Sequence, residues 1–238
     1  MSFPISVRSW TSRLRLAGVL AFLLLPVSAW AFFYSSEGIE SWVVDAETEK
    51  PLAGVIVVAH WELRGGFEGG YPVNEVQITE TVTDAKGRYY LPAWGPKLAV
   101  TGVARNGWPV ILLFKPGYGY RGLTNELSAD KMGYKSQWDK KTVKLEPFRG
   151  SSAEYAAQLY PLSAHLWIIG FEVGQHSGDY CGWKSFPRTL RALDELDPKF
   201  SAARATRRTV ASMLKDNDRQ IQEKGCGSVY EVLSRPER

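Results

Sequence analysis

The residues of this chain best suited to chemistry lie close together between His176 and Cys181. His176, Asp179 and Cys181 fall within six consecutive positions, and His176 is one of only 3 histidines in 238 residues. Imidazole, carboxylate and thiolate groups are ligands of zinc, and a cysteine beside a histidine is also a usual nucleophile–base pair. Ser177 lies in the same segment, but without the spacing of a nucleophile elbow. The segment is therefore the candidate metal site, or the centre of a small hydrolase.

A disulfide is the competing interpretation of Cys181. Cys181 and Cys226 are the only 2 cysteines of the chain, and two cysteines in an oxidising compartment usually pair. Closing that loop would stabilise the fold by about 4 kcal/mol, because it lowers the entropy of the unfolded chain. We therefore predict a disulfide between them, no catalytic residue, no bound metal and no cofactor. Two buried thiols are the alternative.

His60 is a second histidine with an acidic neighbour. It precedes Glu62 by two positions, so both side chains would lie on one face of a strand. A metal would need a third ligand, and a single histidine on a strand is more often packed or simply at the surface. We predict no metal at His60.

Aromatic side chains in predicted loops form another candidate site. Exposed tryptophan and tyrosine rings can stack on sugars or anchor a protein partner. The residues concerned are Trp94, Trp108, Tyr118, Tyr120 and Trp138. The alternative is that these rings cover the ends of the fold and bind nothing.

The elements that would hold these residues are short strands up to residue 147. Alternating or continuous apolar runs, separated by turn residues, predict about seven strands. The predicted ranges are 39–45, 55–63, 75–83, 88–91, 98–105, 109–114 and 142–145. The turn at 84–87 and the Asn106-Gly107 pair each predict a hairpin. This pattern is typical of an antiparallel β-sandwich.

Helices are predicted after residue 148. Helical spacing marks 152–159, 162–169 and 185–196, with an irregular stretch at 170–183. An apolar stripe then runs from Phe200 to Ile221 at helical spacing, after an Asp197-Pro198 start and before Gly225 as a C-cap. The stripe predicts a packed helical extension rather than a membrane face.

The first 31 residues resemble a secretory signal. Arg8, Arg13 and Arg15 precede an apolar run, 16–27, and Ala29-Trp30-Ala31 offers small residues at the two cleavage positions. Cleavage near Ala31 would release a periplasmic or secreted protein. An uncleaved anchor is the alternative, and it would be the only membrane contact. Three of the four net positive charges lie in this segment, so the charge predicts no nucleic-acid partner.

The strand region resembles the carboxypeptidase regulatory-like domain, a transthyretin-like β-sandwich found in exported bacterial proteins. The matching residues are Val44-Asp45 with Glu47-Thr48, Pro51-Leu52-Ala53-Gly54-Val55, Thr81-Val82-Thr83-Asp84, Gly87-Arg88-Tyr89, Leu91-Pro92 and Lys115-Pro116-Gly117-Tyr118. The resemblance covers about residues 38–147 and implies a non-catalytic module. The zinc-binding pattern of the metallocarboxypeptidases is absent.

Hydroxyisourate hydrolases share the transthyretin fold and provide an enzymatic comparison. They carry a histidine in a His-Val-Leu-Asp motif of the first strand, where this chain has Trp42-Val43-Val44-Asp45. Their terminal Tyr-Arg-Gly-Ser is similar to Phe148-Arg149-Gly150-Ser151, after which this chain continues. An indole cannot replace an imidazole as a general base, so this resemblance implies no such activity.

Together these features predict three segments: a signal peptide at 1–31, a mainly β, seven-stranded transthyretin-like (prealbumin-like) antiparallel sandwich at 32–147, and a C-terminal α-helical extension at 148–238. The predicted function is an exported, non-catalytic binding or structural module with a protein or cell-envelope partner. A carbohydrate-binding module that uses the loop aromatics and a hydrolase centred on His176 are the alternatives.

Overall fold

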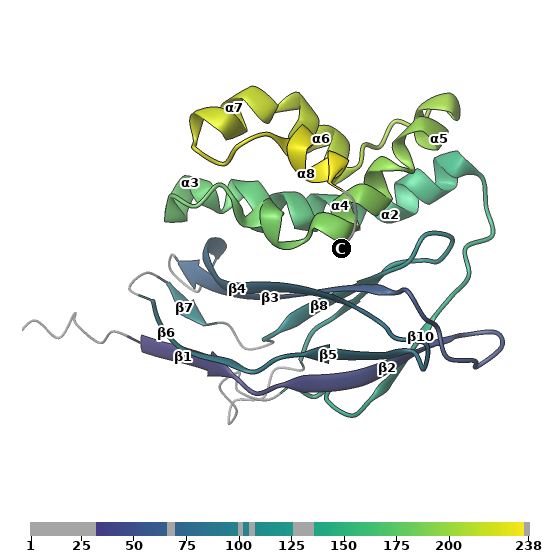
Figure 1. Ribbon diagram of the computed structural model, residues 1–238, viewed down its shortest axis with the longest axis horizontal. Helices are drawn as coiled ribbons and strands as arrows, with labels where there is room; N and C mark the ends of the chain where they lie inside the picture. Colours follow the sequence, from purple (N-terminus) through teal and green to yellow (C-terminus); the bar gives the residue numbers. More distant parts are fainter. Residues whose placement is uncertain (1–31, 66–69, 100–101, 105–107, 126–135, 236–238) are drawn as a thin grey trace, which may run out of the picture. The chain divides into compact units, whose positions relative to one another are not determined.

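The computed structural model describes residues 32–65, 70–99, 102–104, 108–125 and 136–235 (Figure 1). The chain divides into two compact units, Met1–Phe32 and Phe33–Arg238, and the second holds nearly all described residues. The signal segment and the Asn106-Gly107 turn lie outside the described residues. Among the helices that are described, none combines the length and the apolar character needed to span a bilayer.

The predicted fold class is confirmed in that the chain is mainly β, with a two-sheet sandwich followed by helices. The described strands are β1 (Phe32–Ser36), β2 (Ile39–Asp45), β3 (Ile56–Gly65), β4 (Tyr71–Val82), β5 (Arg88–Leu91), β6 (Trp94–Ala99), β7 (Val103–Ala104), β8 (Val110–Phe114), β9 (Arg121–Leu123) and β10 (Thr142–Leu145). One sheet has the order β10-β2-β5, a second has the order β4-β3-β8-β9 with β7 also on β3, and β1 pairs with β6. β1 and β9 were not predicted.

The two main sheets enclose one apolar core. Alternate residues of β2 point inward, among them Ile39 and Val43, and they pack with Trp61 and Leu63 of β3 and with Tyr89 of β5. This period of two is what a half-buried strand requires. The residues between these inward positions on β2 are only half-buried.

The helices form a layer on the other face of the larger sheet (Figure 1). They are α2 (Ser152–Trp167), the π-helix η2 (Ile168–Glu172), α3 (Gly174–Ser177), the 3-10 helix η3 (Gly182–Ser185), α4 (Pro187–Asp194), α5 (Asp197–Ala202), α6 (Val210–Asp216), α7 (Asp218–Glu223) and α8 (Val229–Ser234). Val58 of β3 and Phe114 of β8 share an apolar cluster with Leu159 and Leu166 of α2. Strand β3 is therefore buried on both faces, as its continuous apolar run predicted.

Both predicted hairpins are wrong in their pairing. The turn at 84–87 forms, with Gly87 N donating to Asp84 O at 2.9 Å, but β4 pairs with β3 and β5 pairs with β2. The turn thus carries the chain from one sheet to the other. Strands β7 and β8 likewise both pair with β3. In addition, β10 runs parallel to β2, so the sandwich is not purely antiparallel.

The helical predictions differ from the structure at Pro161, within 170–183 and after Phe200. The stretch predicted to be irregular contains part of η2, all of α3 and part of η3. Helix α2 continues through Pro161, where two helices were predicted, because the face carrying Leu159, Leu162 and Leu166 is buried. A capping box at Ser151 and Glu154 starts it. The stripe from Phe200 to Ile221 is divided among α5, α6 and α7, although most of its apolar residues are buried as expected. Gly225 follows α7 with φ of 79°.

Glu80 of β4 ties the sheet to the helical layer. Its carboxylate accepts hydrogen bonds from the backbone N–H groups of Arg188 and Thr189, at 2.9 and 2.8 Å, and from the Thr189 hydroxyl at 2.8 Å. A carboxylate at the first turn of α4 satisfies donors that the helix itself cannot, and it complements the helix dipole.

We expect Glu80→Ala to lower the free energy of unfolding by about 2 kcal/mol, because it leaves these buried donors unpaired. Urea unfolding followed by circular dichroism measures this loss. Glu195→Ala, at the C-terminal end of the same helix, is the control and should change stability by less than about 0.5 kcal/mol. Equal losses in the two variants would contradict the capping role.

Candidate functional site

Three buried or half-buried polar side chains form a row between the larger sheet and α2. His60 Nδ1 lies 3.1 Å from Glu75 Oε2, and His60 Nε2 lies 2.8 Å from His165 Nε2. The His60 side chain has no exposed surface and that of Glu75 is 8% exposed. The rings of His60 and His165 meet edge to face. These residues come from β3, β4 and α2, so only the packed fold assembles the row.

A β-bulge in the β3–β4 ladder places Glu75 in this row. The register shifts between Trp61 and Glu62, so that Trp61 pairs with Gln77 but Glu62 pairs with Glu75. Val76 is the extra residue, and it packs against the inner core while Ile78 packs against the helical layer. Strict alternation along β4 would place Val76 and Ile78 on one face, and the bulge inverts that alternation at one point.

Glu62 extends the cluster on β3. Its Oε1 accepts a hydrogen bond from Arg64 Nε at 2.6 Å, and its side chain is 12% exposed. One ligand atom from each of His60, Glu62 and Glu75 lies within 4.8 Å of the other two. The third metal-binding group that the sequence did not reveal beside His60 is thus supplied by the neighbouring strand.

Burial controls the charges in the row. Desolvation raises the pKa of the Glu75 carboxyl above its ordinary value, and the opposing influence of His60 does not cancel this rise. Desolvation also lowers the pKa of His165 to about 3, with smaller contributions from the charges of His60 and Arg64. His165 is therefore neutral near pH 7. The short contact between the two Nε2 atoms then requires the Nε2–H of one ring to donate a hydrogen bond to the Nε2 of the other.

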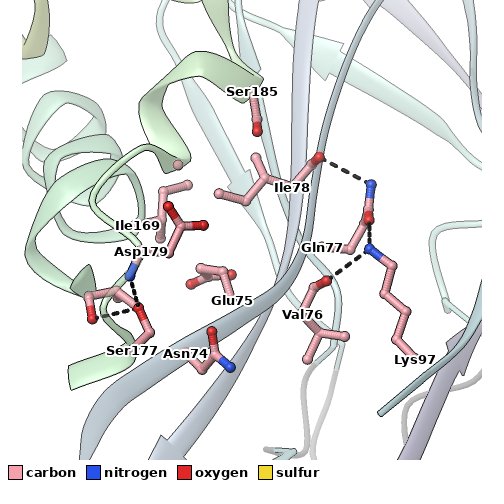
Figure 2. Close-up of a pocket in the computed structure, with 12 residues that line it drawn as sticks. Asn74, Glu75, Val76, Gln77, Ile78, Lys97, Ile169, Ser177, Asp179 and Ser185 are labelled. Atoms are coloured by element: carbon pink, nitrogen blue, oxygen red, sulfur yellow. Dashed lines mark hydrogen bonds between the residues drawn. The ribbon is translucent and has the colours of Figure 1, made fainter. Parts of the chain in front are cut away.

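A cavity adjoins this row. It has a volume of about 260 Å³, lies between β4 and the segment from η2 to η3, and is lined by Asn74, Glu75, Ser177, Asp179 and Ser185 among others. Figure 2 shows the Glu75 side chain pointing from β4 toward the segment that carries Ser177 and Asp179. Oε1 of Glu75 is inaccessible to solvent and has no hydrogen-bond partner among the described residues. The arrangement can pass a proton along the row or hold a cation against Glu75.

His176, Asp179 and Cys181, the candidate site from the sequence, have separate partners in the structure. Cys181 forms a disulfide with Cys226, with a Cα–Cα distance of 5.3 Å, which confirms the predicted bond. The sulfur of Cys181 is therefore not a thiolate nucleophile. His176 is exposed and its ring contacts Tyr71. Asp179 accepts a hydrogen bond from Cys181 N at 2.8 Å, and the only three-residue ligand group found among the described residues is that of His60.

The five loop aromatics are also separated. Trp108 is buried, and its Nε1 donates to Glu62 O at 2.6 Å. Trp94 packs edge to face on Trp61, whereas Tyr118 donates to Asp45 and Trp138 donates to Thr124 O. Tyr120 packs against the helical-layer core instead. In the described part of the chain, no two of the five are in ring–ring contact.

Comparisons with known proteins identify no family for this chain. Neither a family model nor a curated protein matches the sequence. Solved structures with limited similarity include a streptococcal ancillary pilin (TM-score 0.27, 14% identity, 48% of this chain and 30% of that chain). A 3-chlorocatechol 1,2-dioxygenase from Rhodococcus opacus 1CP gives TM-score 0.32 and 14% identity over 50% of this chain and 62% of that one. The shaft pilin SpaA from Lactobacillus rhamnosus GG gives 0.24 and 15% over 50% and 52%. The chain thus spans less than two thirds of each, and the fold assignment rests on the strand pairing itself.

Proposed function

We propose that this chain is an exported, non-catalytic module of the carboxypeptidase regulatory-like type that binds a protein partner in the cell envelope. Its sandwich would occupy 32–147 and its helical extension 148–238. One observation carries the proposal: the larger sheet is covered on both faces, whereas the described residues leave the outer face of the β10-β2-β5 sheet open.

The open face has the composition of a binding surface. Trp42 lies on it half-buried and Tyr90 is 52% exposed, while Arg88 and Lys140 are each paired with Glu40 at its edge. Aromatic side chains inside a charged rim are the usual anchors of protein interfaces. Because the rim charges are already paired, the aromatic groups would provide most of the binding free energy.

Export is supported by the oxidised cysteine pair. Disulfides form in the periplasm and outside the cell and are rare in the reducing cytosol. The Cys181–Cys226 bond closes a separation of 45 residues within the helical layer. Together with the leader-like first 31 residues, it favours a periplasmic or secreted location.

A binding role is favoured over the two alternatives. The hydrolase hypothesis needs a reactive group beside His176, and Cys181 is held in the disulfide. The carbohydrate hypothesis needs exposed rings on a shared surface, and Trp108 is in the core. Trp42, which stands where hydroxyisourate hydrolases carry histidine, lies on the open face.

Site-specific photo-crosslinking tests the proposed surface. A benzophenone amino acid at Tyr90, introduced in cells that export the protein, should yield a discrete protein adduct. The control is the same group at Tyr230 of α8, which is 54% exposed and should yield none. The proposal fails if Tyr90 gives no adduct, or if both positions give the same adducts. Fractionation of the same cells would refute export if the chain stays in the cytosol with Cys181 reduced.

A further inference from the structure

We infer that His60, Glu62 and Glu75 bind a divalent first-row transition metal ion, with His165 positioning the His60 ring. This site is independent of the partner surface proposed above, because it lies between the larger sheet and α2, whereas that surface is the outer face of the β10-β2-β5 sheet. The inference rests on the geometry of the cluster and on a buried Glu75 oxygen that no described residue pairs.

The first step is the spacing of the donors. Metal–ligand bonds of about 2.0–2.1 Å in a tetrahedral site place neighbouring ligand atoms about 3.3 Å apart. His60 Nδ1 and Glu75 Oε2 are 3.1 Å apart, so this edge of the site is already formed. Since the ligand atoms of all three residues lie within 4.8 Å of one another, a rotation of the Glu62 carboxylate would complete three of the four positions.

The second step is the unpaired oxygen. Glu75 Oε1 is buried and has no hydrogen-bond partner in the part of the chain that the structure describes, and the Glu75 side chain is only 8% exposed. A buried carboxylate oxygen without a partner is costly, and native proteins rarely keep one. A cation bound by Glu75 would remove this cost and offset the negative charge that Glu62 and Glu75 bring together.

The third step is the role of His165. A histidine that binds a metal through one nitrogen nearly always uses the other to donate a hydrogen bond, and this fixes its tautomer. His60 Nε2 lies 2.8 Å from His165 Nε2. When the Nε2–H of His60 donates a hydrogen bond to Nε2 of His165, Nδ1 of His60 carries a lone pair that points toward Glu75 and is free to bind the ion. His165 is thus a positioning residue.

The fourth step is access. Glu75 lines the cavity of about 260 Å³ whose other walls include Asn74, Ser177 and Asp179. Asp179 is exposed, so the cavity provides a polar route by which an ion and a water ligand can reach Glu75. Two carboxylates and an imidazole are a donor set that suits zinc and its first-row neighbours.

Zinc and cobalt titrations test the site. The untagged, oxidised protein is treated with a chelator, dialysed and titrated with Zn²⁺ against a chromogenic competitor, and then with Co²⁺ while its visible absorption is recorded. We expect one ion per chain. Glu75→Gln, which keeps the side-chain volume, and Glu62→Gln should each weaken Zn²⁺ binding by at least about 100-fold, and His165→Gln by about 10- to 100-fold.

The controls separate a built site from surface binding. His176→Gln removes an exposed histidine outside the cluster and should leave both the affinity and the Co²⁺ spectrum unchanged. His165→Gln should alter the Co²⁺ spectrum, which a purely structural role would not do. The inference is overturned if the wild-type protein binds no ion in a one-to-one ratio. It is equally overturned if His176→Gln abolishes binding, or if the folded Glu75→Gln and Glu62→Gln variants bind as the wild type does.

Discussion

Gly87→Ala is expected to lower the free energy of unfolding by about 3 kcal/mol or more. Gly87 adopts φ of 69° at the turn where the chain passes from one sheet to the other, and a Cβ atom there would lie 2.3 Å from Val43 O and 3.0 Å from Leu52 N. Both are backbone atoms, and Val43 N also donates to Gly87 O at 2.8 Å. A left-handed conformation costs a non-glycine residue about 1–2 kcal/mol, and displacement of two backbone segments adds to this cost.

Gly117→Ala provides the matched control. Gly117 has φ of 84°, so alanine suffers a similar backbone penalty, but its added Cβ would meet nothing within 4 Å. We expect a loss of only about 1 kcal/mol. Urea unfolding of both variants, followed by tryptophan fluorescence, isolates the effect of crowding at Gly87. Equal losses would show that β2, the 51–52 segment and the turn are not in close contact, and the sheet-to-sheet crossing would have to be redrawn.

Removal of the disulfide is expected to lower the free energy of unfolding by about 4 kcal/mol. Cys226 is fully buried, and the bond connects residues 45 positions apart across the helical layer. Without it the unfolded chain gains conformational freedom, while the apolar contacts of Trp183, Leu214 and Ile221 remain. We expect the Cys181→Ser/Cys226→Ser variant to fold, with a much lower midpoint in urea.

Reductant distinguishes loss of the bond from damage caused by the serines. Dithiothreitol should lower the urea midpoint of the wild-type protein nearly to that of the double variant, and it should leave the variant unchanged. If the wild-type midpoint does not move under reducing, denaturing conditions that expose both thiols, the bond contributes nothing to stability. The chain-entropy argument would then be wrong for this loop.

The sequence predicted the strands better than their partners. The run 55–63 is largely apolar and rich in β-branched residues, which favours a strand, and both it and 88–91 appear close to the predicted bounds. The partner of a strand depends on the path of the chain in space. The turn ending at Gly87 is compatible with a hairpin and with a crossing between sheets, and its local sequence does not distinguish them. The continuity of α2 through Pro161 was missed for a similar reason, because burial of its leucines outweighs one lost backbone hydrogen bond.

The candidate site was missed for two physical reasons. His165 and His60 are 105 residues apart in sequence, and only the docking of α2 on β3 brings them together. Strict alternation along 75–83 would put Glu75 and Ile78 on opposite faces of the strand, and the bulge at Val76 breaks that alternation. One signal in the sequence could have indicated the cluster. Glu62 and Glu75 lie near the ends of two predicted strands that are joined by the glycine-rich segment 65–70, so the two carboxylates could be expected to lie close together.

The parallel pairing of β2 with β10 has a kinetic consequence. Trp42 is the register partner of Thr142, so the smaller sheet needs a contact between residues one hundred positions apart before its central strand has both neighbours. Such non-local contacts require loop closure before they yield any stabilisation, and they slow folding. A chain that passes from its N-terminus through a narrow translocation pore would thus emerge with β2 lacking its β10 neighbour. The smaller sheet would stay incompletely folded until residues 142–145 had also emerged.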